Sequence, residues 1–273
     1  MTLWQSILLG IVQGITEFLP VSSSGHLVLV PFLLGWKIPT DQAFIFDVLV
    51  QIGTLLAVIV YFWRDLWAIL RGLYRAALHR SLADEPDAKL GLLLILATIP
   101  AGLAGLLLKD LVEQAFGSPR ATGFFLLVTA VLLWVAETVG KRSRPLTSLT
   151  WKDALWIGAA QALSIFPGIS RSGSTIAAGV SRHFQRADAG RFSFLMMIPV
   201  MSAAGLLSFL DLLEAPNFTS FLPIVLAGFI TSALVGYACI AWLLRFLNRN
   251  SLKGFAYYCL GAGLLLILWT YVF

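Results

Sequence analysis

Charged residues are scarce in this chain of 273 residues. Aspartate, glutamate, lysine and arginine together make up 12% of it, whereas hydrophobic residues make up 59%. Soluble domains carry roughly 25% charged residues, so this composition excludes the ordinary water-soluble classes. The mean hydropathy of +0.87 agrees with that exclusion. We therefore predict an integral membrane protein that forms a single domain over residues 1–273.

Cysteine is rare as well, and a compact basic patch is missing. Cys239 and Cys259 both lie within apolar runs, where we expect small buried residues rather than a disulfide or a metal site. The formal net charge is +5, but the basic residues lie in short loops and are not interleaved with aromatic residues on one surface. We expect no nucleic acid partner.

Six apolar runs are long enough to cross a bilayer, which takes about 20 residues of helix. Two further apolar stretches, residues 3–36 and 153–180, are interrupted in the middle by proline, glycine and hydroxyl residues, and they predict hairpins of two half-helices. We expect an all-α polytopic membrane protein with about ten helices in total and a short cytoplasmic helix in the loop 71–89. The six runs are residues 42–63, 90–108, 121–139, 190–213, 220–244 and 254–273.

Loop charges predict the orientation of the spans. By the positive-inside rule, loops rich in lysine and arginine are cytoplasmic, so the segments 109–120 and 214–219 and both termini lie outside. This alternation requires each interrupted stretch to return to the side from which it entered, as a re-entrant hairpin does. The basic residues number five in 64–89, four in 141–152, three in 182–191 and three in 245–253.

The two interrupted stretches resemble each other at a constant offset of 148 residues. The shared positions are mostly polar residues and glycines, so we infer a duplication with a first repeat in residues 1–140 and a second in 151–273. Each half holds one hairpin and three spans, an odd number, and the second half is therefore inverted. The shared pairs include Gly10/Gly158, Gln13/Gln161, Phe18/Phe166, Ser22/Ser170, Ser24/Ser172 and Gly25/Gly173.

Inverted hairpins enter the membrane from opposite faces and bring their tips together near the midplane. Irregular backbone at that depth is tolerated only where it is buried in protein or lines a polar cavity. The polar residues of the two tips should therefore form one site. A lipid-phosphate flippase or an anion transporter on the same inverted repeat is the alternative to an enzyme.

The first tip offers groups for binding a cation and for proton transfer. Gln13 and Glu17 lie four residues apart on one helix face, where their oxygens suit a divalent metal ion, Mg²⁺ or Ca²⁺. Ser22 and Ser23 follow the break, where hydroxyls either cap the next half-helix or react. His26 lies within one turn of both and can activate a hydroxyl or a water molecule. The sequence leaves the nucleophile open between Ser23 and water.

The second tip offers groups for binding an anion. Arg171 presents a planar guanidinium to phosphate oxygens and begins a half-helix whose N-terminus favours negative charge. Ser170, Ser172 and Thr175 lie beside it. A buried ion pair of Arg171 with Glu17 that merely joins the halves is the plainer interpretation, but it leaves the histidine and the hydroxyls unexplained. Phosphoryl transfer accounts for all of these groups.

Two motifs match a known family. Gln13-Gly-Ile-Thr-Glu17, followed by Phe-Leu-Pro-Val-Ser-Ser-Ser-Gly-His26, and Pro167-Gly-Ile-Ser-Arg-Ser-Gly-Ser-Thr175 resemble the undecaprenyl-diphosphate phosphatases of bacteria. The resemblance implies hydrolysis of undecaprenyl diphosphate to the monophosphate and inorganic phosphate, which recycles the lipid carrier of peptidoglycan and other envelope polymers and confers bacitracin resistance. It also implies a divalent metal ion and a periplasm-facing site in the bacterial inner membrane.

The resemblance also implies roles for individual residues. The catalytic residues are expected to be Glu17, Ser23, His26 and Arg171. Substrate contacts are expected from Ser22, Ser170, Arg171, Ser172 and Thr175, and metal contacts from Gln13 and Glu17. Gln13 stands where other members have glutamate, so one carboxylate must suffice for the metal. The expected partners are the lipid substrate and the bilayer, and a homodimer stays open.

Overall fold

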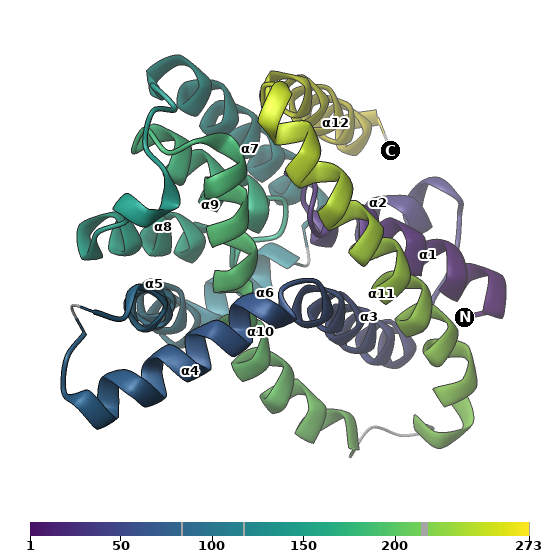
Figure 1. The fold of residues 1–273 in the computed structure, drawn as a ribbon. Coiled ribbons are helices and arrows are strands. Elements are labelled where there is room, and N and C mark those ends of the chain that lie inside the picture. Colours follow the sequence, from purple (N-terminus) through teal and green to yellow (C-terminus); the bar gives the residue numbers. More distant parts are fainter. Residues whose placement is uncertain (83, 117, 214–217, 273) are drawn as a thin grey trace.

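The computed structural model describes residues 1–82, 84–116, 118–213 and 218–272, and it consists of helices joined by short loops (Figure 1). Six helices are long and apolar enough to cross a membrane. They confirm the six predicted spans and the all-α polytopic class. These helices are α3 (Thr40–Tyr61), α5 (Pro86–Leu107), α7 (Pro119–Val139), α10 (Arg186–Leu213), α11 (Phe218–Arg249) and α12 (Lys253–Val272).

Both interrupted stretches are pairs of short helices. The first pair is α1 (Leu3–Thr16) and α2 (Ser23–Leu33), and the second is α8 (Trp151–Leu163) and α9 (Arg171–Ser181). The two helices of each pair pack against each other. With 11 to 14 residues each, all four are shorter than the roughly 20 residues that a bilayer requires. The predicted hairpins of half-helices are confirmed.

The predicted count of about ten helices is too low. The described residues contain twelve α-helices and a short 3-10 turn, η1 (Leu146–Ser148), because α4 (Trp63–His79) and α6 (Lys109–Phe116) add to the spans and hairpins. The short helix predicted within 71–89 has the wrong bounds. The amphipathic pattern of α4 already begins at Trp63, and Pro86, which suits the first turn of a helix, starts α5.

Each hairpin packs against a span of the other half. Helix α1 lies along α11, and α8 lies along α5. Repeat-related glycines make both contacts: a Cβ atom on Gly10 would lie 2.7 Å from the carbonyl oxygen of Gly228, and one on Gly158 would lie 2.3 Å from that of Ala97. A larger side chain fits at neither position. Gly10 and Gly158 are therefore sites of close backbone packing.

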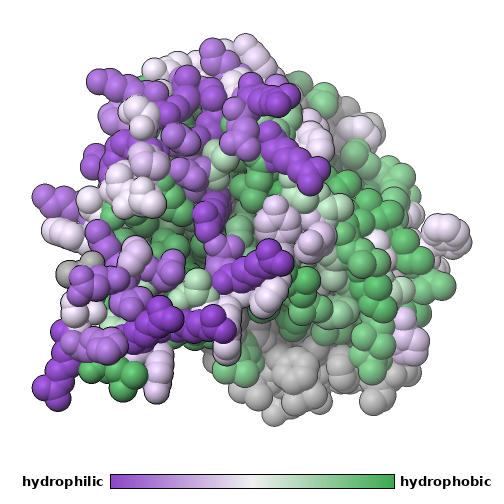
Figure 2. All heavy atoms as spheres, in the orientation of Figure 1, coloured by the Kyte–Doolittle hydropathy of each residue, from purple (hydrophilic) through white to green (hydrophobic). Residues whose placement is uncertain are grey.

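Hydrophilic side chains gather on one side of the molecule, around the ends of α4 and α8, and the surface becomes hydrophobic toward α11 (Figures 1 and 2). The buried Asp153 carboxylate binds Arg144 at 2.7 Å and Arg182 at 2.8 Å there. Burial alone would raise the pKa of Asp153, but hydrogen bonds from Arg144, Arg182 and Thr150 hold it well below its usual range. These contacts fasten the basic loops that the charge pattern assigns to the cytoplasm.

Candidate active site

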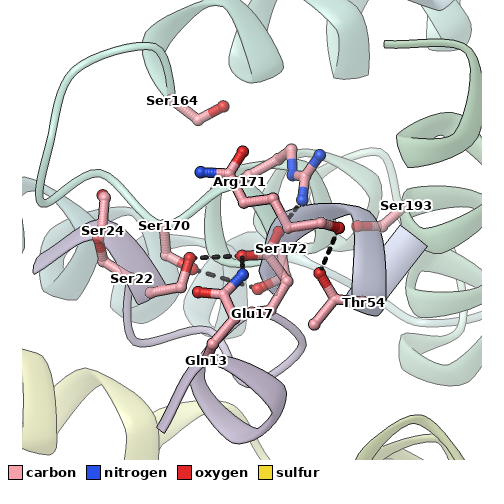
Figure 3. A network of polar contacts seen from close by, with 12 residues as sticks. Gln13, Glu17, Ser22, Ser24, Thr54, Ser164, Ser170, Arg171, Ser172 and Ser193 are labelled. Atoms are coloured by element: carbon pink, nitrogen blue, oxygen red, sulfur yellow. Dashed lines mark hydrogen bonds and ion pairs between the residues drawn. The ribbon is translucent and has the colours of Figure 1, made fainter. Parts of the chain in front are cut away.

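The tips of the two hairpins meet in one polar cluster (Figure 3). Glu17, the C-cap of α1, forms an ion pair with Arg171, the first residue of α9. Beside it, the Ser172 hydroxyl donates a hydrogen bond of 3.1 Å to the carbonyl oxygen of Leu19. The structure thus brings together the two segments that the repeat predicts to form one site.

Three donors converge on the Glu17 carboxylate, which is only 8% exposed. Oε1 accepts from Arg171, while Oε2 accepts from Gln13 Nε2 at 3.0 Å and from the Ser23 hydroxyl at 2.5 Å. Gln13 reaches the carboxylate because it lies one helical turn earlier on α1. A hydroxyl held directly on a carboxylate has the arrangement of a nucleophile and its base.

Two buried atoms of this cluster lack a hydrogen-bond partner among the described residues. They are Gln13 Oε1 and Arg171 Nη1. Buried polar atoms are nearly always paired, so these two are available to a ligand. The amide oxygen is an acceptor and suits a cation, whereas the guanidinium nitrogen is a donor and suits a phosphate oxygen.

The residues around Glu17 fit a metal ion that is shared with a substrate. The described part of the chain holds no group of three or more histidine, cysteine, aspartate or glutamate side chains that could bind a metal. Among the described residues, the side chains around Glu17 therefore offer only part of a metal ion's coordination. Mg²⁺ commonly takes one or two carboxylates together with substrate phosphates and water, and Glu17 with the free oxygen of Gln13 offers such a partial set.

His26 makes its hydrogen bonds outside this cluster. Its Nδ1 lies 2.7 Å from the carbonyl oxygen of Ser22, and its Nε2 lies 2.6 Å from the hydroxyl of Tyr258 on α12. Within the described residues the imidazole bonds no serine hydroxyl, so the direct activation of Ser22 or Ser23 expected from their spacing is not the arrangement found. Sequence reasoning missed Tyr258, because tyrosines near span ends usually act as interfacial anchors.

The serines at the breaks cap the following half-helices. Ser22 Oγ accepts from the backbone N–H of Gly25 at 3.3 Å, and Ser170 Oγ accepts from that of Gly173 at 3.0 Å. The capping interpretation of Ser22 therefore holds, and the repeat-related Ser170 does the same. Ser22 adopts this role with a φ of 72°, in the left-handed region that non-glycine residues seldom enter.

The backbone of Arg171 is supported from α10. The Thr175 hydroxyl donates to the carbonyl oxygen of Arg171 at 2.7 Å and lies 2.6 Å from the hydroxyl of Ser193. Both hydroxyls are buried. Thr175 thus contributes to the site by holding the arginine in place. Ser193 was not singled out in the sequence, since a lone serine within a long apolar helix carries no spacing signal.

Each tip is also held by the last span of the opposite half. The hydroxyl of Thr129 on α7 donates to Gly168 at 3.1 Å, and the thiol of Cys259 on α12 approaches the carbonyl of Pro20 at 3.4 Å. Pro20 and Gly168 correspond at the repeat offset. Both cysteines are free and buried, as predicted, but Cys259 also acts as a weak donor to the first tip.

Comparison with known proteins gives the same picture over nearly the whole chain. The family model described as bacitracin resistance protein BacA matches residues 6–265. A protein of Thermomicrobium roseum named undecaprenyl-diphosphatase is 42% identical, with 98% of each chain covered. Proteins with the same name from Alcanivorax borkumensis (44% identical, 97% of this chain and 98% of that one) and Synechococcus elongatus (43%, 94% and 89%) agree. A match of this extent includes both hairpins, and the chain therefore belongs to the BacA family of bacitracin resistance proteins.

Proposed function

We propose that this protein hydrolyses undecaprenyl diphosphate to undecaprenyl phosphate and inorganic phosphate, in the bacterial inner membrane and from a site open to the periplasm. Family membership and the names of the relatives support the reaction. The observation that carries it is the pair of unpartnered atoms, Gln13 Oε1 and Arg171 Nη1, on either side of the bonded Glu17 and Ser23. An acceptor for a cation, a donor for a phosphate and a nucleophile with its base thus lie together.

Arg171 binds the diphosphate, and Ser23 is the nucleophile. Ser23 gives its proton to Glu17 and attacks the terminal phosphorus. A bond forms between Ser23 Oγ and phosphorus, the bond from phosphorus to the bridging oxygen breaks, and undecaprenyl phosphate leaves. The hydrogen bond that Ser23 donates to Glu17 favours this choice over direct attack by water.

The second step hydrolyses the phosphoserine. Water attacks the phosphorus and loses a proton, for which His26 is the base. The bond between phosphorus and Ser23 Oγ breaks, the serine oxygen recovers its proton from Glu17, and inorganic phosphate is released. Glu17 and His26 thus serve successive steps, in agreement with their separate hydrogen bonds.

A divalent cation, Mg²⁺ or Ca²⁺, belongs to this proposal. Glu17 and the free amide oxygen of Gln13 would hold it, with phosphate oxygens and water completing its coordination. When bound, the ion supplies charge neutralisation at the diphosphate and polarises the bonds to phosphorus. Chelation is therefore expected to abolish hydrolysis, and Mg²⁺ or Ca²⁺ to restore it.

Phosphate release by purified protein in detergent tests the function. Wild-type protein should release phosphate from undecaprenyl diphosphate, and Arg171→Ala should not, at equal yield and thermal stability. Detergent removes the sealed compartments that lipid flipping needs, so release there is hydrolysis. Failure of the wild type to release phosphate with either metal would overturn the proposal, and a Glu17→Gln protein that still moves lipid across vesicles would revive a flippase.

A trapping experiment tests the nucleophile. Substrate labelled with ³²P in the terminal phosphate is mixed with excess enzyme and quenched in acid after one turnover. His26→Gln should accumulate labelled Ser23, because it forms the phosphoserine but hydrolyses it slowly. If neither His26→Gln nor the wild type carries label, while phosphate is still released, water is the nucleophile.

A further inference from the structure

His26 is held by the last helix of the chain. The hydroxyl oxygen of Tyr258 lies 2.6 Å from Nε2, and the two rings stack with centroids 5.7 Å apart and planes 13° from parallel. The other ring nitrogen, Nδ1, lies 2.7 Å from the carbonyl oxygen of Ser22. Both nitrogens of the imidazole are therefore occupied, and Tyr258 is the group on the nitrogen that faces away from the backbone of α2.

The Ser22 carbonyl determines where the imidazole protons lie. A carbonyl oxygen only accepts hydrogen bonds, so Nδ1 carries a hydrogen and donates it to Ser22. In the neutral ring Nε2 is then the acceptor, and the Tyr258 hydroxyl donates to it. When Nε2 gains a proton, it donates to the tyrosine oxygen instead, and the phenolic hydrogen becomes free. A proton that enters or leaves this imidazole does so through the bond to Tyr258.

Helix α12 presents Tyr258 from a fixed position. The following residue, Cys259, approaches the carbonyl oxygen of Pro20 in the first tip, and α12 packs along α7. The Tyr258 side chain is 48% exposed. Tyr258 is thus half-exposed, and its hydroxyl is held by His26.

The second tip has no such pair. Ser174 occupies the position that corresponds to His26 at the repeat offset. Val128 of α7 corresponds to Tyr258, since the next residue of each helix holds the carbonyl of a tip. The histidine and the tyrosine are therefore found together only at the tip that carries Glu17 and Ser23, the tyrosine coming from the last span of the opposite half. If the pair only served packing, the equivalent contact in the other half would be expected to keep it.

We propose that Tyr258 is a further catalytic residue, a proton relay between His26 and the water that attacks the phosphoserine. The tyrosine hydroxyl passes its hydrogen to Nε2 while its oxygen takes one from the water, and phosphorus receives the resulting hydroxide. The hydroxyl is regenerated within the same step, and the proton gained by Nε2 leaves with the phosphate product by the reverse path. This inference rests on the proposed hydrolysis, in which His26 is the base.

Removal of the hydroxyl alone tests the relay. Tyr258→Phe keeps the stacked ring and should lower kcat by about 100-fold, at the lower end of the range that proton transfer by a positioned group contributes, with KM unchanged. Tyr258→Phe added to His26→Gln should cause no further loss, because the relay acts through the imidazole. Tyr257→Phe is the matched control: it is the neighbouring tyrosine, packs on Trp134 with centroids 5.2 Å apart, and should retain wild-type turnover.

The outcomes separate this inference from the proposed function. Full activity of Tyr258→Phe would overturn the relay. So would a loss of kcat from Tyr258→Phe that is as large in the His26→Gln background as in the wild type. In both cases an active wild type would still support the proposed hydrolysis. An inactive wild type would instead refute the hydrolase. The hydrogen bond between His26 and Tyr258 can be measured by NMR from the ¹⁵N resonances of the three histidines in protein reconstituted in lipid. The Nε2 signal that His26→Gln removes should shift in Tyr258→Phe and stay in place in Tyr257→Phe.

Discussion

At the first tip Ser22 caps α2 with a φ of 72°, whereas at the second tip Ser170 caps α9 with a φ of −69°. Both serines also lie 3.2 Å from the hydroxyl of the serine two residues later. A non-glycine residue in a sparsely populated backbone region costs about 1–3 kcal/mol, and the strained tip is the one that carries Glu17 and Ser23. Both tips have the serine cap. Only the first tip combines a strained cap residue with Glu17 and Ser23.

The paired glutamines show the same divergence. Gln13 donates to Glu17 at 3.0 Å. Gln161, its counterpart, has no partner for either side-chain atom among the described residues, and Ile165 stands where a second glutamate would be. An amide present in both copies thus serves a carboxylate in only one. The two tips thus share a frame, and their side chains differ at the positions where we propose that the reaction takes place.

The largest expected effect comes from the carboxylate that only the first tip has. Glu17→Gln should lower turnover at least about 1,000-fold, since it removes the base of Ser23 and the charge that pairs with Arg171. Ile165→Gln at the equivalent position of the second tip should leave turnover within about twofold of the wild type. Phosphate release in detergent, with thermal unfolding as the check on folding, measures both. Comparable losses would mean that the two tips are not specialised.

The second expected effect concerns the guanidinium. Arg171→Lys should lower kcat/KM by about 100-fold, because an ammonium cannot hold Glu17 and a phosphate oxygen with the fork geometry of arginine. Arg191→Lys is the control, as Arg191 pairs with Asp65 away from the tips and should keep full activity. A fully active Arg171→Lys protein would show that charge alone is needed at this position.

A smaller effect separates the two amides. Gln13→Leu should lower turnover about tenfold and weaken the dependence on Mg²⁺, because it removes the free oxygen beside Glu17. Gln161→Leu should leave turnover unchanged and leave stability unchanged or raise it, since an unpartnered buried amide costs about 1–3 kcal/mol. Metal titrations of activity and thermal unfolding in detergent provide the readouts. Loss of activity in Gln161→Leu would give the second amide a role in the reaction.

The smallest expected effect compares the caps. Glycine adopts a positive φ without strain and replaces a serine cap at a cost of a few tenths of a kcal/mol. Ser22→Gly should therefore be more stable than Ser170→Gly by about 1 kcal/mol, measured by unfolding in mixed detergent. Equal stabilities would show that the backbone at Ser22 is not strained.

Local patterns predicted most of the fold. Span lengths and the interruptions by proline and glycine identified the six spans and both hairpins, because the bilayer fixes helix length. The bounds of α4 could not be read, since its amphipathic pattern follows α3 after a single residue, Phe62, without a turn signal. The predicted outer segment 214–219 lies largely outside the described residues, which omit 214–217.

The candidate site was predictable where its residues belong to the repeat. Glu17, Ser23 and Arg171 lie in motifs, and the predicted inversion of the hairpins brings those motifs together. The partners contributed by later spans were not predictable: Tyr258 is 232 residues from His26, and neither it nor Ser193 stands in a pattern. Their contacts arise from packing between helices, which a single sequence does not record.

The ion pair of Glu17 with Arg171 also affects the growing chain, because the two residues are 154 positions apart. At about 5–20 residues per second, roughly 8–30 s pass between their syntheses. During that time a carboxylate lies in a newly inserted hairpin without its cation. Tyr258, in the last helix, is made later still. Until Arg171 has been made, no growing chain holds both members of the ion pair, and the two tips cannot form their common cluster.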